Sequence, residues 1–63
     1  MEQIKEFRNS LGLTINEFAQ EIKVSKSLHE KIESGARKPS REYITKLKSR
    51  YPQFDTNLLF AKQ

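Results

Sequence analysis

Cysteine is absent from this sequence, so disulfide bonds are excluded as a source of stability. The single histidine, His29, cannot supply a set of zinc ligands by itself, which comes close to excluding a structural zinc site. No apolar run approaches the ~18 residues that span a bilayer, and the segment after Met1 is acidic and amphipathic, unlike a signal peptide. We therefore expect a soluble, intracellular protein.

Apolar residues are also few, at 35% of a chain of 63 residues. A folded chain of this length buries only about 60% of the surface that its unfolded form exposes, so its stability is marginal. We expect one domain over residues 1–63, stabilised by close helix packing or by a second chain.

Positive charge is concentrated in the middle of the sequence. The chain carries 12 Lys and Arg against 8 Asp and Glu, a net charge of +4. Residues 23–50 alone hold nine cations and three carboxylates, whereas residues 1–22 are net negative and residues 51–63 are neutral. This pattern suggests a polyanionic partner, either nucleic acid or an anionic membrane surface, although solvation of helix surfaces explains the charge equally well.

Apolar residues recur at helical spacing in five segments, and no segment shows the sustained alternation of a strand. We expect an all-α fold, a compact bundle of about five short helices that depend on packing against one another. Residues suited to helix ends separate the segments. These residues are Gly12, Thr14 with Glu17, Ser25, Gly35, Ser40, Pro52 and Asp55.

Residues 14–34 form the most informative pattern, a capped short helix, a turn of three or four residues and a second short helix that ends before glycine. Ala19 is a small residue where the two helices would cross, which allows their close approach. The pattern predicts a helix-turn-helix unit, whose second helix has the shape needed to enter the major groove of DNA.

Four stretches, residues 13–19, 24–27, 32–35 and 38–40, together resemble the Cro/CI-type helix-turn-helix family, the lambda-repressor-like or Xre-like domains. The resemblance covers nearly the whole chain. It implies a sequence-specific transcriptional regulator of double-stranded DNA, a Cro-like phage or small bacterial repressor that is associated with the nucleoid. Such a protein binds a pseudo-palindromic operator as a dimer.

The resemblance makes the helix at about residues 25–33 the recognition helix. Lysine side chains suit guanine O6 and N7, and a serine hydroxyl donates or accepts. Leu28 fits contact with a thymine methyl and fits burial equally well, because it lies four residues before Ile32. The implied base-reading residues are Lys26, Ser27, Lys31 and Leu28.

Two further segments are implied to hold the DNA backbone. The N-terminus of the second helix should present N–H groups to a phosphate, and three cations follow the recognition helix closely. The implied phosphate-binding residues are Thr14, Asn16, Arg37, Lys38 and Arg41. For the cations Lys46, Lys48 and Arg50, one helix further on, we expect solvation instead.

This sequence departs from the family pattern at three positions. Ile15 replaces a common glutamine, whose phosphate contact Asn16 is a candidate to replace. Lys23 replaces a common glycine, at a penalty of about 1 kcal/mol if φ is positive there. His29 replaces an aliphatic residue that faces inward in the family. We expect either a hydrogen-bonded core histidine or a donor that faces the groove. A pH dependence of folding or binding through His29 is a hypothesis.

The C-terminal segment is apolar for a chain end, and in this family the corresponding region often forms a dimer interface. We expect a homodimer, in solution or only on DNA. A protein-interaction module, an adaptor or antitoxin, is the main alternative, whereas a membrane-bound helix has little support because basic residues do not flank the segment. The candidate interface residues are Phe54, Leu58, Leu59 and Phe60.

An enzyme is not expected, because one histidine, no cysteine and a small core leave little room for a catalytic pocket. Residues 29–33 read H-E-x-x-E and lack the second histidine of a zinc-protease helix. We expect Glu33 instead to hold the recognition helix or the following loop through a cation such as Arg37. No cofactor, metal or small-molecule ligand is expected, so control should come from concentration and dimerisation.

Overall fold

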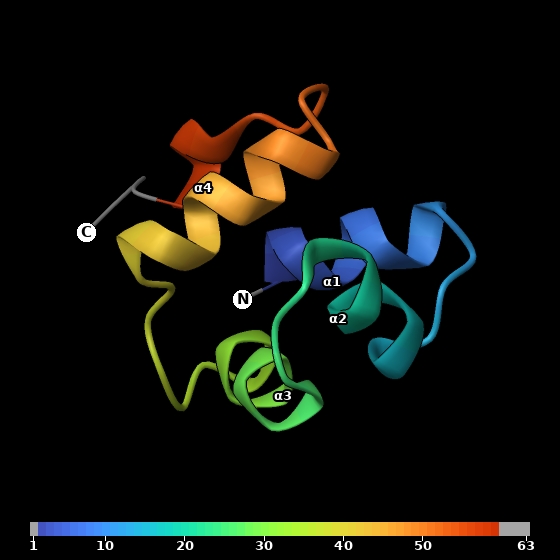
Figure 1. Ribbon diagram of the computed structural model, residues 1–63, viewed down its shortest axis with the longest axis vertical. Coiled ribbons are helices and arrows are strands. Elements are labelled where there is room, and N and C mark those ends of the chain that lie inside the picture. The colour runs from blue at the N-terminus through green and yellow to red at the C-terminus, as the bar shows by residue number, and fades with distance from the viewer. Residues whose placement is uncertain (1, 60–63) are drawn as a thin grey trace.

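The computed structural model describes residues 2–59, and they form four α-helices and one 3-10 turn (Figure 1). No strand occurs in this range, so the expected all-α class is confirmed. Within the same range, no helix is both long enough and apolar enough to cross a membrane. The elements are α1 (Glu2–Ser10), α2 (Ile15–Ile22), α3 (Lys26–Ser34), α4 (Arg41–Arg50) and the turn η1 (Thr56–Leu59).

The expectation of a fifth helix is corrected to four helices and a turn. The segment after Asp55 forms a 3-10 turn of four residues, which is wound more tightly than an α-helix. The backbone N–H of Asn57 donates to the Asp55 carboxylate over 3.0 Å, so Asp55 still begins the element.

Helices α2, α3 and α4 begin at the residues that the sequence predicted. Thr14 accepts the N–H of Glu17 at 3.1 Å, and the Glu17 carboxylate accepts the N–H of Thr14 at 2.9 Å, which completes a capping box. Ser25 and Ser40 accept in the same way at the starts of α3 and α4. Gly35 ends α3 in the left-handed conformation, with φ +86°.

The turn between α2 and α3 is a Schellman motif built on lysine. The Lys23 N–H donates to the carbonyl of Gln20, and the Val24 N–H donates to that of Ala19 at 3.0 Å. Lys23 has φ +64°, so the positive φ considered from the sequence is present. Glycine adopts this conformation without strain, whereas lysine does not. Ala19, the small residue expected where the two helices cross, is buried.

One core joins all four helices. Aromatic rings dominate its centre, where Phe18 stacks on Tyr51 at 5.5 Å between centroids and Phe7 packs on Phe54 at 4.8 Å. The buried cluster is Ile4, Phe18, Ile22, Ile32, Tyr43, Leu47, Tyr51 and Phe54.

Phe54 therefore belongs to the core of its own chain, where it is only 6% exposed. The sequence placed it in a dimer interface, but its ring is covered by α1 through Phe7. The side chains of Leu58 and Leu59 and the whole of Phe60 lie outside the part that the structure describes. The contact between copies through Leu58, Leu59 and Phe60 stays a prediction.

Candidate nucleic-acid interface

Helix α3 has an outer face in solvent and an inner face in the core. The separation follows from 3.6 residues per turn, which brings residues three and four apart onto one side. The inner face consists of His29, Ile32 and Glu33, with Leu28 at its border. The outer face consists of Lys26, Ser27, Glu30, Lys31 and Ser34.

Three of the four implied base-reading residues lie on the outer face. Lys26 and Ser27 occupy the first turn of α3, and Lys31 follows one turn later, all exposed. Leu28 is half-buried and packs against the core, so its burial is the better supported of its two interpretations. The outer face thus presents two cationic donors and a hydroxyl, groups that suit guanine edges and phosphates.

Glu30 is an outer-face residue that the sequence reasoning did not single out. It is exposed, and it lies four residues after Lys26 and three after Ser27, which places it on the same side of α3. A carboxylate accepts hydrogen bonds only, and at a base edge it suits the amino group of cytosine. Helical spacing from Lys26 was the signal that could have identified it.

At the N-terminus of α2, the two implied phosphate-binding residues are in different situations. Thr14 is exposed, but its N–H and its hydroxyl oxygen are both used in the capping box, which leaves the hydroxyl proton to donate. Asn16 is exposed with its side chain in solvent. The N–H groups of Ile15 and Asn16, in the first turn, have no intrahelical acceptor and suit an anion.

The other implied phosphate-binding residues follow α3 in the loop and at the start of α4. The Arg37 N–H donates to the Lys31 carbonyl at 3.2 Å, which folds the loop back onto the end of α3. The side chains of Arg37, Lys38 and Arg41 are all exposed. Four cations, counting Lys31, therefore lie at or beyond the C-terminal half of α3.

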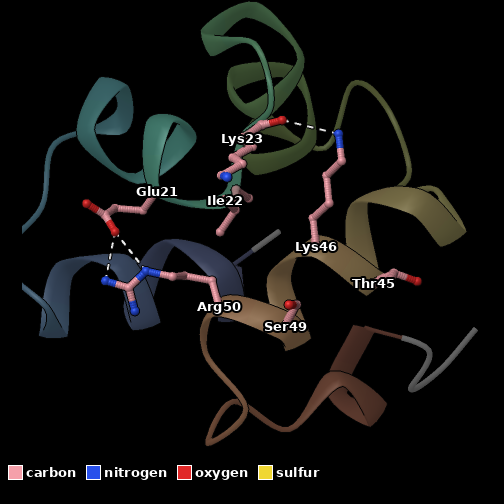
Figure 2. Close-up of a pocket in the computed structure, with 7 residues that line it drawn as sticks. All are labelled: Glu21, Ile22, Lys23, Thr45, Lys46, Ser49 and Arg50. Carbon is pink, nitrogen blue, oxygen red and sulfur yellow. Dashed lines mark hydrogen bonds and ion pairs between the residues drawn. The ribbon is translucent and has the colours of Figure 1, made fainter.

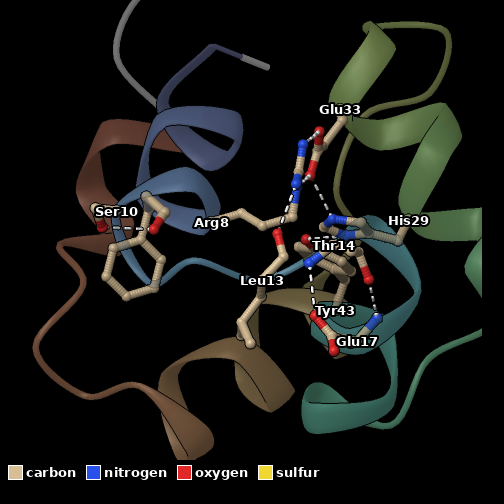
Figure 3. A network of polar contacts seen from close by, with 9 residues as sticks. Arg8, Ser10, Leu13, Thr14, Glu17, His29, Glu33 and Tyr43 are labelled. Atoms are coloured by element: carbon tan, nitrogen blue, oxygen red, sulfur yellow. Dashed lines mark hydrogen bonds and ion pairs between the residues drawn. The ribbon is translucent and has the colours of Figure 1, made fainter.

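Behind α3, an ion pair connects its inner face to α1 (Figure 3). The Arg8 Nε donates to the Glu33 Oε2 at 2.6 Å and a second guanidinium nitrogen to Oε1 at 3.2 Å, while a third donates to the Leu13 carbonyl at 2.8 Å. Glu33 thus holds α3 through a cation, one of the two roles expected from the sequence, and Arg8 of α1 supplies the positive charge. Burial would raise the pKa of Glu33, but hydrogen bonds from Arg8 and His29 lower it below its usual value.

His29 extends this network to α4. Its ring is fully buried, with Nε2 at 2.6 Å from the Glu33 carboxylate and Nδ1 at 2.9 Å from the Tyr43 hydroxyl. The expectation of a hydrogen-bonded core histidine is confirmed over that of a groove-facing donor. Burial lowers the pKa of His29 below its ordinary value of 6.5, against the opposing effect of Glu33. Burial likewise raises the pKa of Tyr43.

A separate pocket of about 360 Å³ lies between the end of α2 and α4 (Figure 2). Two contacts within the chain cross it. Arg50 pairs with Glu21 at 2.7 Å, and the Lys46 amine donates to the Lys23 carbonyl at 3.2 Å. These two cations of α4, for which solvation was expected, therefore have partners in their own chain.

Comparison with known protein families finds a match over most of the chain. Residues 2–51 match the family model of the helix-turn-helix domain, which covers all four α-helices. No curated protein and no solved structure matches the chain.

Proposed function

The chain belongs to the helix-turn-helix domain family, and on that premise we propose that it is a sequence-specific, Cro/CI-type regulator that binds double-stranded DNA. The carrying observation is the outer face of α3, where Lys26, Ser27 and Lys31 are exposed on a helix whose inner face is fixed in the core. In helix-turn-helix proteins the second helix of the unit, which corresponds to α3 here, lies in the major groove with its N-terminal residues on base edges.

Within this proposal, the outer face of α3 reads bases and the segments beside it hold the backbone. Lys26 and Lys31 donate to guanine or to phosphate, and Glu30 accepts from cytosine. The free N–H groups at the start of α2 bind one phosphate. Further phosphate contacts come from the exposed side chains Thr14, Asn16, Arg37, Lys38 and Arg41.

We further propose that the protein is a Cro-like repressor and binds a pseudo-palindromic operator as a dimer. The two half-sites of the operator lie about one helical turn apart. The segment after α4 is the candidate contact between copies, through Leu58, Leu59 and Phe60. Figure 1 supports this arrangement, because α3 and η1 lie at opposite ends of the view, so pairing through that segment leaves α3 accessible. The activity requires no catalytic step and belongs in the cytoplasm, at the nucleoid.

Binding-site selection from random duplexes, followed by a salt titration of the affinity for the selected duplex, tests the proposal. We expect an enriched motif and a log–log slope of magnitude about 4 to 8, because several phosphates are neutralised. The double variant Lys26→Ala/Lys31→Ala should bind at least about tenfold more weakly, with a slope smaller by about 2.

Lys48→Ala is the matched control, since Lys48 is an exposed lysine of α4 outside the outer face of α3. It should leave affinity and slope nearly unchanged. If selection yields no motif and the double variant behaves like the wild type, the proposal fails and a protein-interaction module becomes the better account.

A further inference from the structure

The buried ring of His29 links the inner face of α3 to two other helices. Through Glu33 it reaches Arg8 of α1, and through Nδ1 it reaches Tyr43 of α4 (Figure 3). Helix α2 also packs on it, with the Phe18 ring at 4.9 Å between centroids. One side chain of α3 thus contacts all three remaining helices, directly or through one residue.

The hydrogen-bond partners determine where the protons of this network lie. The ionised Glu33 carboxylate can only accept, so His29 Nε2 carries a proton. In the neutral ring Nδ1 then accepts, and the Tyr43 hydroxyl donates to it. Every buried side-chain nitrogen and oxygen in residues 2–59 has a partner, so the network is fully satisfied with His29 neutral.

A second proton on the ring disturbs this arrangement. Both ring nitrogens then donate, so the Tyr43 oxygen must accept from Nδ1 and its own proton must turn away into a buried site. The charged groups around the ring act in opposite directions, since Arg8 of α1 disfavours the imidazolium while Glu33 and Glu30 of α3 favour it. Loss of water from the ring is the largest effect and also disfavours the charge.

We propose that His29, neutral and protonated at Nε2, is a positioning residue that fixes the outer face of α3, so that protonation of its ring lowers the affinity for DNA in mildly acidic solution. The inference rests on the proposed function. Its physical basis is that the hydrogen bonds of the neutral ring to Tyr43 and Glu33 hold α3 in place, so DNA binding favours the neutral ring and weakens as the ring of the free, folded protein takes up a proton.

The test measures the affinity for the selected duplex by fluorescence anisotropy between pH 8 and 5.5, with the folded fraction followed by circular dichroism at the same temperature. We expect the wild type to stay folded and to bind more weakly at pH 5.5, by less than about tenfold, because the pKa of His29 in the folded protein lies below 6.5. His29→Gln, whose amide can donate and accept but does not titrate here, should bind with an affinity that does not depend on pH.

A wild-type affinity that is constant over this range overturns the inference, and so does an equal loss in His29→Gln or a loss that merely follows unfolding. If His29→Gln does not fold, the ring nitrogen shifts of the labelled wild type decide instead. They should report the neutral Nε2–H form at pH 7.5 and a charged ring as binding weakens, and any other tautomer contradicts the proposal. Absence of any selected duplex at any pH would count against DNA binding itself, which separates the two failures.

Discussion

The nine residues of α3 are divided between two faces that are built in opposite ways. On the inner face, Glu33 bonds to Arg8 of α1 and His29 bonds to Tyr43 of α4. The outer face carries Lys26, Lys31 and Glu30 in solvent. The inner face thus fixes where the helix lies, while the outer face is free to recognise a ligand, so substitutions on the two faces should change different quantities.

The largest effect is expected on the inner face, for Glu33→Ala. Removal of this carboxylate leaves the largely buried Arg8 guanidinium without its anion and His29 Nε2 without its acceptor. The free energy of unfolding should fall by about 3 kcal/mol, a large fraction for a domain of this length. Urea denaturation followed by circular dichroism measures it.

Glu30→Ala is the matched control on the outer face of the same helix. It removes an exposed carboxylate, so the free energy of unfolding should change by no more than about 0.5 kcal/mol. Equal destabilisation by the two variants would contradict the division of α3 into two faces.

A smaller loss is expected for Tyr43→Phe, which removes the hydroxyl that donates to His29 Nδ1. The volume of the side chain is kept, but a buried acceptor is left without a donor, and about 1 to 2 kcal/mol of stability should be lost. Tyr51→Phe, a buried ring whose hydroxyl lies outside this network, serves as the comparison in thermal unfolding. The account requires Tyr43→Phe to be the more destabilising of the two.

The smallest effect is a gain, expected for Lys23→Gly in the turn between α2 and α3. Relief of the left-handed conformation at φ +64° should stabilise the domain by up to about 1 kcal/mol. Lys46 donates to the backbone carbonyl of residue 23, so this contact survives the substitution. Chemical denaturation that shows a loss of stability would mean that the Lys23 side chain itself is needed.

The sequence was most informative where structure is local. Thr14 with Glu17, Ser25, Ser40 and Gly35 were identified as helix ends because a cap involves residues only two to four apart. Helical spacing likewise separated the exposed residues Lys26 and Lys31 from the buried Ile32. The terminal 3-10 turn was mistaken for a helix because periodicity over four residues does not distinguish the two.

Which residues contact each other across the core cannot be predicted from the sequence in this way. Arg8 and Glu33 are 25 residues apart, and several cations nearer in sequence, including Arg37, were equally suitable partners by charge. The sequence assigns Phe54 to an interface, because no local pattern shows that the segment after α4 folds back and packs Phe54 on Phe7. Both outcomes are decided by tertiary packing, which a local pattern does not encode.

Amide shifts of the ¹⁵N-labelled domain, titrated with the selected duplex, test the central claim that the outer face of α3 binds DNA. We predict that the largest shifts occur at residues 26–31 and 35–38 and at the start of α2, with little change in the C-terminal half of α4. Shifts confined to α4 and η1, with the amides of α3 unchanged, would contradict the account.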